Sequence, residues 1–184
     1  MHFSDYLEKI LNMYADADVE PGLQGAADLA EIEALEQDFG FPLPEELKQA
    51  WLTANGGGYY RALFARPGYL TGYDFLSLSE SMKERIGMQK RAPQYLGYEQ
   101  EKARDARICP GWYEPGWLPF ASFGGSTLLL ILDMSPTAQG QAGQIICFTH
   151  DADRIEYVAA SFNDLLTASL QMFEEEADEL IYSD

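Results

Sequence analysis

The chain has 184 residues, of which 47% are apolar and 13% aromatic, so it can bury one sizeable core and has the usual length of a single domain. Its 12 basic and 30 acidic residues give a formal net charge of −18. Nucleic acid and anionic membranes are bound through Lys and Arg, so neither is expected as a direct partner of so acidic a chain.

The charge is distributed unevenly along the chain. Residues 1–50 hold 12 acids and 2 bases, residues 51–110 hold 6 and 9, and residues 111–184 hold 12 and 1, which gives net charges of −10, +3 and −11. Acidic side chains can simply keep a protein soluble, or they can attract a cationic partner. Composition alone leaves both interpretations open.

Features of export, membrane insertion and metal binding are missing from the sequence. Residues 1–9 carry acids where a signal peptide needs a basic stretch, and the longest apolar run, residues 127–132, has the length of a strand. Cys109 and Cys147 make no disulfide framework and no zinc spacing. We therefore expect a cytoplasmic protein without a cofactor or a metal.

The first 55 residues predict three helices. Helical spacing of apolar residues predicts the first over residues 3–14, followed by a loop over residues 15–27. Asp28 and Glu31 have capping-box spacing at the start of the second, which Gly40 ends. Pro44 suits the first turn of the third, and Asn55 and Gly56 are expected to end it with left-handed backbone. The residues expected to face the core are Phe3, Tyr6, Leu7, Ile10, Leu11 and Tyr14, then Leu29, Ile32, Leu35 and Phe39, then Leu47, Ala50, Trp51 and Ala54.

The middle of the chain has weaker patterns. Residues 59–65 and 75–78 predict two strands, and a helix is predicted from Ser79 with Met82 and Ile86 facing inward. Residues 87–115 contain most of the basic residues and no clear period, so they predict a long, partly irregular excursion.

The C-terminal third predicts a β-meander followed by a helix. Turn residues separate four β-rich runs at 117–121, 127–133, 143–149 and 154–159. Gly124 and Gly125 supply the positive φ angles of one turn. Ser161 and Asp164 repeat the capping-box pattern before a last helix, whose end carries the acids of residues 174–179, where the helix dipole disfavours them.

Combinations of residues that could support catalysis are weak. Cys147 and His150 are three positions apart, so they point to opposite faces if one strand contains both. His150, Asp151 and Asp153 fit a hairpin turn better than a metal site. Residues 56–58 are glycines that lack the Lys-Ser/Thr pair of a phosphate loop. The sequence therefore predicts no enzyme.

Partner binding is the remaining possibility. Aromatic residues on loops offer rigid contact area to a partner, although they can equally pack beneath the loops as core. The residues predicted to contact a partner are Tyr59, Tyr60, Trp112, Tyr113 and the adjacent Glu114, together with the acidic set Glu174, Glu175, Glu176, Asp178 and Glu179.

The ordered set of short motifs resembles the SUKH superfamily, the Smi/Knr-like proteins, over most of residues 28–170. The residues that carry this resemblance are Ile32, Leu35, Glu36, Phe39, Gly40, Leu43, Pro44, Leu47, Trp51 and Asn55 to Gly57, then Trp117 to Phe120, Leu132, Asp133, Gly143, Phe148 and Ala160 to Phe162. The resemblance implies an α+β fold with a mixed or mainly antiparallel sheet flanked by helices. It also implies binding without catalysis: bacterial members are typically immunity proteins that neutralise secreted toxins such as nucleases, while fungal relatives regulate the cell wall.

These observations together predict one SUKH-like domain over residues 1–184, in which residues 1–27 form an N-terminal extension and residues 174–184 an acidic tail. Its expected function is non-catalytic protein binding, as an immunity protein whose partner is a basic toxin domain. The alternative is a regulatory or scaffold module that binds a cellular protein without any toxin.

Overall fold

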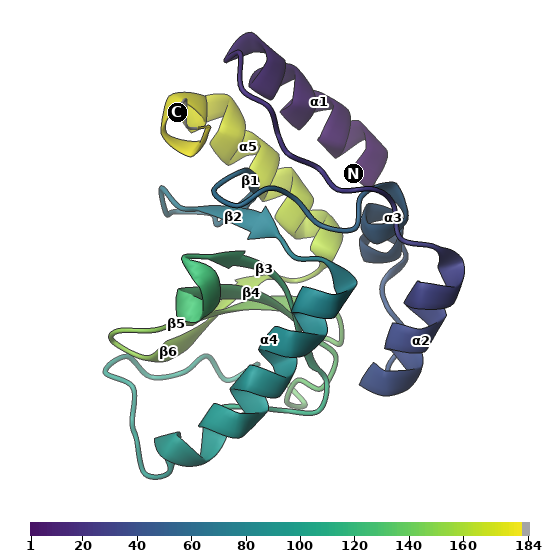
Figure 1. The fold of residues 1–184 in the computed structure, drawn as a ribbon. Helices are drawn as coiled ribbons and strands as arrows, with labels where there is room; N and C mark the ends of the chain where they lie inside the picture. Colours follow the sequence, from purple (N-terminus) through teal and green to yellow (C-terminus); the bar gives the residue numbers. More distant parts are fainter. Residues whose placement is uncertain (182–184) are drawn as a thin grey trace.

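Three helices, two strands, a fourth helix, four strands and a last helix follow one another along the chain (Figure 1). A computed structural model describes residues 1–181. The helices are α1 (Phe3–Asp16), α2 (Leu29–Phe39), α3 (Glu45–Thr53), α4 (Leu78–Arg91) and α5 (Phe162–Leu180), with short 3₁₀ turns η1 (Ala92–Tyr95) and η2 (Gly125–Thr127). The strands are β1 (Ala62–Ala65), β2 (Gly72–Phe75), β3 (Trp117–Phe123), β4 (Leu128–Asp133), β5 (Gln144–Thr149) and β6 (Arg154–Ala159).

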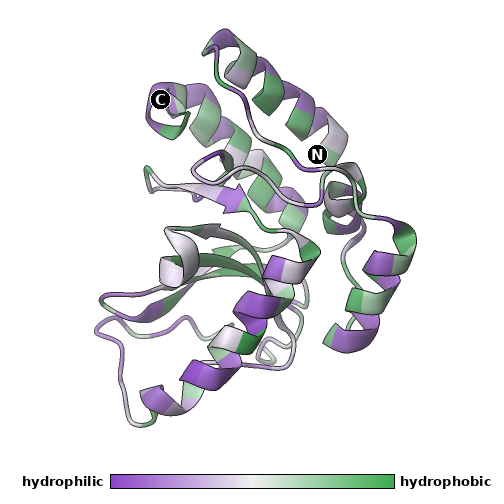
Figure 2. Cartoon of the chain, in the orientation of Figure 1, coloured by the Kyte–Doolittle hydropathy of each residue, from purple (hydrophilic) through white to green (hydrophobic). Residues whose placement is uncertain are grey.

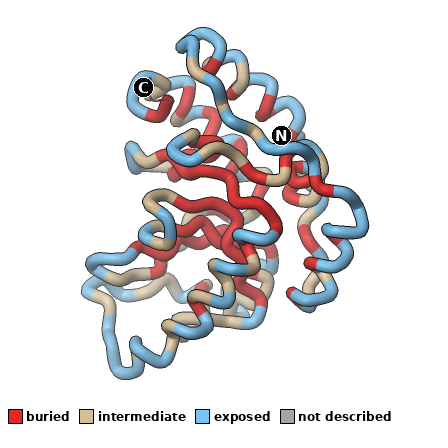
Figure 3. The backbone as a smooth tube through the Cα atoms, viewed as in Figure 1, coloured by how far each residue is buried: buried red, intermediate tan, exposed pale blue. Residues whose placement is uncertain are grey.

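The six strands form one antiparallel sheet in the order of the sequence, β1-β2-β3-β4-β5-β6. Side chains alternate between the two faces of a strand, and in β3, β4 and β5 both sets are buried. The sheet is therefore the middle layer of a single α+β domain, as the sequence predicts (Figure 3).

The sheet curls, so that its two ends approach each other. Register shifts interrupt the β1–β2, β3–β4 and β5–β6 pairings, and such bulges bend and twist strands. As a result Arg66, directly after β1, lies 2.9 Å from Glu156 on β6 at the opposite edge. Tyr73 of β2 similarly reaches Cys147 of β5, with 3.4 Å between the hydroxyl oxygen and the sulfur.

The face that we call the helical face carries α1, α3 and α5. Helices α1 and α5 run in the same direction, since Asn163 contacts Met1 and Glu174 lies 4.0 Å from Lys9 (Figures 1 and 2). Their buried hydroxyls are hydrogen-bonded: Tyr6 donates to the Leu63 carbonyl at 2.6 Å, and the Ser169 hydroxyl accepts from the Ala65 N–H at 2.7 Å. The apolar core of this face therefore also satisfies polar groups of β1.

The opposite face, which we call the loop face, is covered by α4 and by residues 92–115. Its buried residues are Met88, Ile108, Trp117, Leu129, Ile131, Ile146, Phe148 and Ile155. Trp112 stacks on Tyr95 with ring centroids 4.3 Å apart, and the Arg104 guanidinium lies 4.9 Å from the Trp112 ring centroid. An irregular segment thus shares with α4 the covering of this face, whereas helices cover the other.

Most helix predictions are confirmed, with local corrections. Asp28 and Glu31 form the expected capping box, and Gly40 ends α2 with φ 83°. Leu29 and Ile86, predicted to face inward, are 56% and 42% exposed and therefore lie on the solvent side of α2 and α4. Pro44 is the residue before α3, not part of its first turn.

The predicted end of α3 is wrong in its mechanism. The cap residue is Ala54, in an extended conformation, and Asn55 does not adopt a positive φ but accepts a hydrogen bond from the Leu78 N–H. Gly56 does have φ 104°, yet the reason is tertiary, since a Cβ there would lie 2.9 Å from the Ser77 nitrogen. Gly56 therefore allows the chain after α3 to pass against the start of α4.

The predicted positions of the two middle strands are wrong by a few residues. The predicted strand 59–65 is confined to Ala62–Ala65, and the one predicted at 75–78 occupies Gly72–Phe75, because Ser77 caps α4. Helix α4 continues to Arg91, so the first part of the predicted excursion is helical. The four C-terminal strands and the positive φ angles of Gly124 and Gly125 are confirmed.

Candidate functional site

Tyr59 and Tyr60 form an exposed aromatic pair on the turn before β1. Their ring centroids are 4.1 Å apart, and their side chains are 69% and 45% exposed. The Tyr60 backbone has φ 55° and its N–H donates to Asp74 at 2.9 Å. That hydrogen bond, together with the close approach of Gly58 to Gly22, fixes the turn on the body of the domain.

A cavity of about 200 Å³ opens beside this pair, which we call the tyrosine pocket. Its lining includes Tyr59 and three carboxylates, Asp74 of β2 and Glu80 and Glu84 of α4, against the single cation Lys83. Glu80 and Glu84 are four residues apart, so they lie on the same face of α4. The pocket therefore combines an aromatic wall with net negative charge.

The three carboxylates are held by different contacts. Glu80 accepts from the Ser77 N–H at 2.8 Å as part of the α4 capping box, and Glu84 accepts from the Ser126 hydroxyl at 2.7 Å. Burial raises the pKa of Asp74, although the Tyr60 N–H opposes the shift. These acids were not among the residues predicted to bind a partner. The sequence did carry two signals that place these acids: Ser77 and Glu80 have capping-box spacing, and Glu80 and Glu84 are four residues apart on one helix face.

Trp112, Tyr113 and Glu114 lie on the loop face, partly buried, and not at the tyrosine pocket. The Trp112 ring packs between Tyr95 and Arg104, and Tyr113 lies 5.6 Å from the Arg85 guanidinium. Burial, and then the charge of Asp133, raise the pKa of Glu114. The structure therefore separates the two sets of aromatic residues that the sequence grouped together.

The acids of residues 174–179 lie in the last turns of α5. Glu174, Glu175, Asp178 and Glu179 are exposed, and Glu176 is partly buried where the helix backbone kinks. Asp16 ends the neighbouring α1, so the C-terminal ends of two adjacent helices carry carboxylates. Residues 182–184, the end of the predicted acidic tail, lie outside the described residues.

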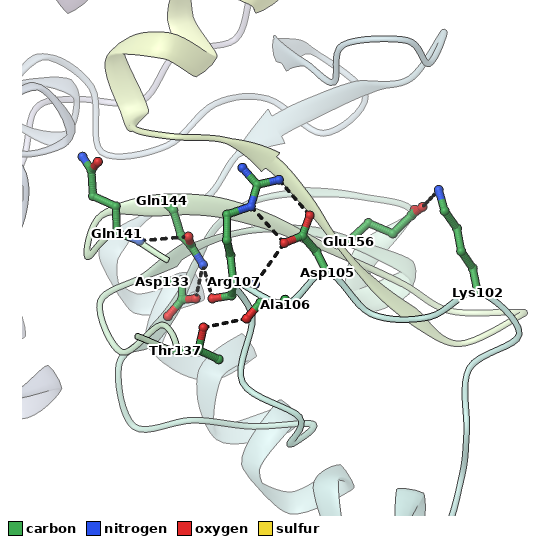
Figure 4. Close-up of polar contacts among 9 residues, drawn as sticks. All are labelled: Lys102, Asp105, Ala106, Arg107, Asp133, Thr137, Gln141, Gln144 and Glu156. Atoms are coloured by element: carbon green, nitrogen blue, oxygen red, sulfur yellow. Dashed lines mark hydrogen bonds and ion pairs between the residues drawn. The ribbon is translucent and has the colours of Figure 1, made fainter. Parts of the chain in front are cut away.

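Some basic residues of the middle segment donate to backbone carbonyls. Arg104 donates to the carbonyls of Cys109 and Gly111, and Arg85 donates to that of Pro115. Polar side chains complete this pattern in Figure 4, where Gln144 joins the Arg107 carbonyl to Asp133 and Thr137 donates to the Ala106 carbonyl. An irregular segment packed on a sheet needs such donors because it lacks regular backbone pairing. Part of the local basic excess is thus structural.

The thiol and imidazole considered in the sequence are separated. Cys147 is fully buried on the helical face, while His150 is exposed and its Nδ1 lies 2.7 Å from Asp153. Within residues 1–181 no group of three potential metal-ligating side chains gathers. In the same part of the chain, no helix has both the length and the apolarity needed to cross a membrane.

Comparison with known proteins extends these observations. The sequence profile of the SMI1 / KNR4 family (SUKH-1) matches residues 26–168. A fission yeast protein (Schizosaccharomyces pombe), named as the cell wall biosynthesis/cell cycle regulator smi1, is 29% identical over 156 residues. That match covers 76% of this chain but 29% of the yeast protein, so the chain spans less than a third of its curated relative. The family match extends over all six strands of the sheet and all of α2, α3 and α4, and the chain belongs to the SMI1/KNR4 (SUKH-1) family.

Proposed function

We propose that this domain acts by binding another protein and carries out no catalysis, and that its partner is a basic toxin domain which it neutralises as an immunity protein. The observation that supports this proposal best is the tyrosine pocket, where an exposed aromatic pair adjoins three carboxylates. Family membership is consistent with the proposal, and so is the net charge of −18.

The chemistry of the pocket favours an Arg or Lys side chain from the partner. A guanidinium or ammonium can lie on a tyrosine ring while its N–H groups donate to carboxylates. Tyr59 supplies the ring, and Glu80 and Glu84 supply charge beside it. Tyrosine at the centre of an interface also loses little conformational entropy on binding.

The acidic ends of α1 and α5 would act earlier, during encounter. Exposed carboxylates project a field that attracts a cationic partner over a distance set by salt, about 10 Å at 0.1 M and about 3 Å at 1 M. We expect these charges to govern the association rate, whereas the desolvated tyrosine pocket governs the dissociation rate.

The proposal is tested by measuring whether this domain binds the proteins encoded by neighbouring genes. A second measurement is whether the domain protects cells that produce those proteins. Y59A/Y60A should raise the dissociation rate at least about tenfold. Tyr98→Ala is the matched control, since Tyr98 is 40% exposed but lies on the loop face, and this variant should bind the partner normally.

A second set of substitutions tests the acidic end of α5. Neutralising Glu174, Glu175, Glu176, Asp178 and Glu179 together should slow association and flatten its salt dependence. Absence of binding and of protection for every neighbouring gene product would contradict the immunity role.

A regulatory module that binds a cellular protein is the second candidate. It is favoured by one observation, the similarity to a protein named as a cell wall and cell cycle regulator. Gene order distinguishes the two candidates: a toxin gene directly upstream supports immunity, and a housekeeping operon supports regulation. The Y59A/Y60A variant tests whether the tyrosine pocket binds the partner in either case.

A further inference from the structure

A second cavity, of about 320 Å³, lies along the outer edge of β6, where the curled sheet brings its two ends together; we call it the seam pocket. Arg66 and Tyr69 line it from the β1–β2 turn, Lys102 and Arg107 from the segment after η1, and Glu156 and Tyr157 from β6. None of these residues belongs to the tyrosine pocket.

The charges at the seam pocket do not balance. Glu156 faces three cations: Arg66 at 2.9 Å, Arg154 at 2.9 Å and Lys102 at 3.9 Å. Although burial opposes the shift, the hydrogen bond from Arg66 and the positive charges of Arg66, Arg154 and Lys102 lower the pKa of Glu156. The other carboxylate, Asp105, is occupied by the Nε and Nη2 groups of Arg107. Three of these cations, Arg66, Lys102 and Arg107, line the cavity with the two carboxylates, which leaves an excess of one positive charge, and Arg154 lies beside Glu156 outside the lining.

Two of these cations keep donors available. The Lys102 side chain is 81% exposed, and its ammonium forms an ion pair with Glu156 (Figure 4) at 3.9 Å, which is beyond hydrogen-bonding distance. The Arg107 guanidinium stacks 3.3 Å from the Tyr157 ring centroid, and its pairing with Asp105 leaves the Nη1 group outside that pair. Both groups border the same cavity.

The surroundings add surface for the rest of a ligand. The Arg66 guanidinium lies 3.9 Å from the Tyr69 ring centroid, so arginine–tyrosine stacks stand at two places around the cavity. Ile155 and Val158 contribute apolar lining. Flat aromatic and apolar walls with an excess of cations suit a small organic anion better than a cation or a neutral ligand.

We infer that the seam pocket binds a small ligand through an oxyanion, a carboxylate or a phosphate, held by Lys102 and Arg107 beside the Arg66–Glu156 pair. In a chain with a net charge of −18, remote acids repel such a ligand. At 0.15 M salt, however, charges farther than about 8 Å are largely screened, so the cations in contact dominate. Glu156 acts as an internal competitor, because its carboxylate already occupies part of the cationic surface.

The test uses glutarate and inorganic phosphate as probes, with NMR detection of the amides of Lys102, Arg107 and Tyr157. At least one probe should give saturable shifts at these amides. Glutarate binding alone indicates a carboxylate ligand, phosphate binding alone indicates a phosphate ligand, and either supports the inference. Absence of saturable shifts with both probes up to about 20 mM, where a dissociation constant of about 1 mM would saturate the site, overturns it.

Three variants locate the binding. Lys102→Gln should weaken it about fivefold or more, since it removes a charge-assisted donor. Lys9→Gln is the matched control, because it changes the net charge equally but lies on α1 beside Glu174, and it should bind as the wild type does. Glu156→Gln removes the competing carboxylate and should tighten binding about threefold or more. Equal affinity in the K102Q and K9Q variants would overturn the inference even if the Glu156 variant fails to fold.

Discussion

The two faces of the sheet are covered in different ways. On the helical face, α1, α3 and α5 satisfy their own backbone groups and bring apolar side chains to the core. On the loop face, residues 92–115 have little regular structure, and arginines, Gln144 and Thr137 donate to their carbonyls. The difference shows how an irregular covering is held in place: side-chain donors pair with carbonyls that regular backbone hydrogen bonding would satisfy in a helix.

The largest expected effect is on the helical face, at Phe64. This side chain is fully buried, and its ring lies 5.5 to 6.1 Å from those of Tyr6, Phe75, Phe120 and Phe162. Phe64→Ala should lower the free energy of unfolding by about 3–5 kcal/mol, as measured by urea denaturation. A loss under about 1 kcal/mol would show that this core is not the main source of stability.

Trp112→Ala tests the loop face and should cost less, about 2–3 kcal/mol, because the ring is only partly buried and the segment can relax around the gap. The effect should also be local. Hydrogen exchange should accelerate in residues 92–115 while α1 and α5 keep their protection. Uniform acceleration across the domain would mean that the two faces unfold as one unit.

Two buried serines sharpen the comparison at the level of single hydroxyls. Ser169 on α5 accepts from the Ala65 N–H, whereas the Ser81 hydroxyl on α4 is buried without a hydrogen-bond partner among the described residues. Ser169→Ala should cost about 1–2 kcal/mol by leaving that N–H unpaired, and Ser81→Ala should be neutral or slightly stabilising. Equal thermal shifts for the two variants would contradict this account.

The smallest expected effect is a dependence on pH at the loop face. Hydrogen bonds from the Arg107 side chain, and then from its backbone N–H, lower the pKa of Asp105 to about 2. Because the folded-state value lies below the unfolded value of about 3.9, this carboxylate stabilises the fold above about pH 4 and loses that contribution as the pH falls through about 2. The difference in melting temperature between the wild type and Asp105→Asn should therefore shrink over this range. If the difference in melting temperature does not change with pH, the effect of the substitution comes from packing and not from the charge of Asp105.

What the sequence determined by itself is local. The caps at Asp28 and Ser161, the apolar stripes of α1, α2, α3 and α5, and the C-terminal meander rest on patterns a few residues long, and apart from Leu29 in α2 they are present in the structure. The ordered motifs also sufficed to indicate the family. Signals were weakest over residues 56–115, where contacts with distant segments outweigh local preference.

Only the tertiary structure decided how those distant segments meet. Gly56 needs its positive φ because Ser77 passes against it, and Tyr59 becomes part of a site because β2 and α4 bring Asp74, Glu80 and Glu84 beside it. The seam pocket depends on Arg66 reaching Glu156, 90 positions away, across a curled sheet. The bulges that bend these strands lie at other positions than Arg66 and Glu156, so the two residues that finally touch carry no sequence signal of their contact.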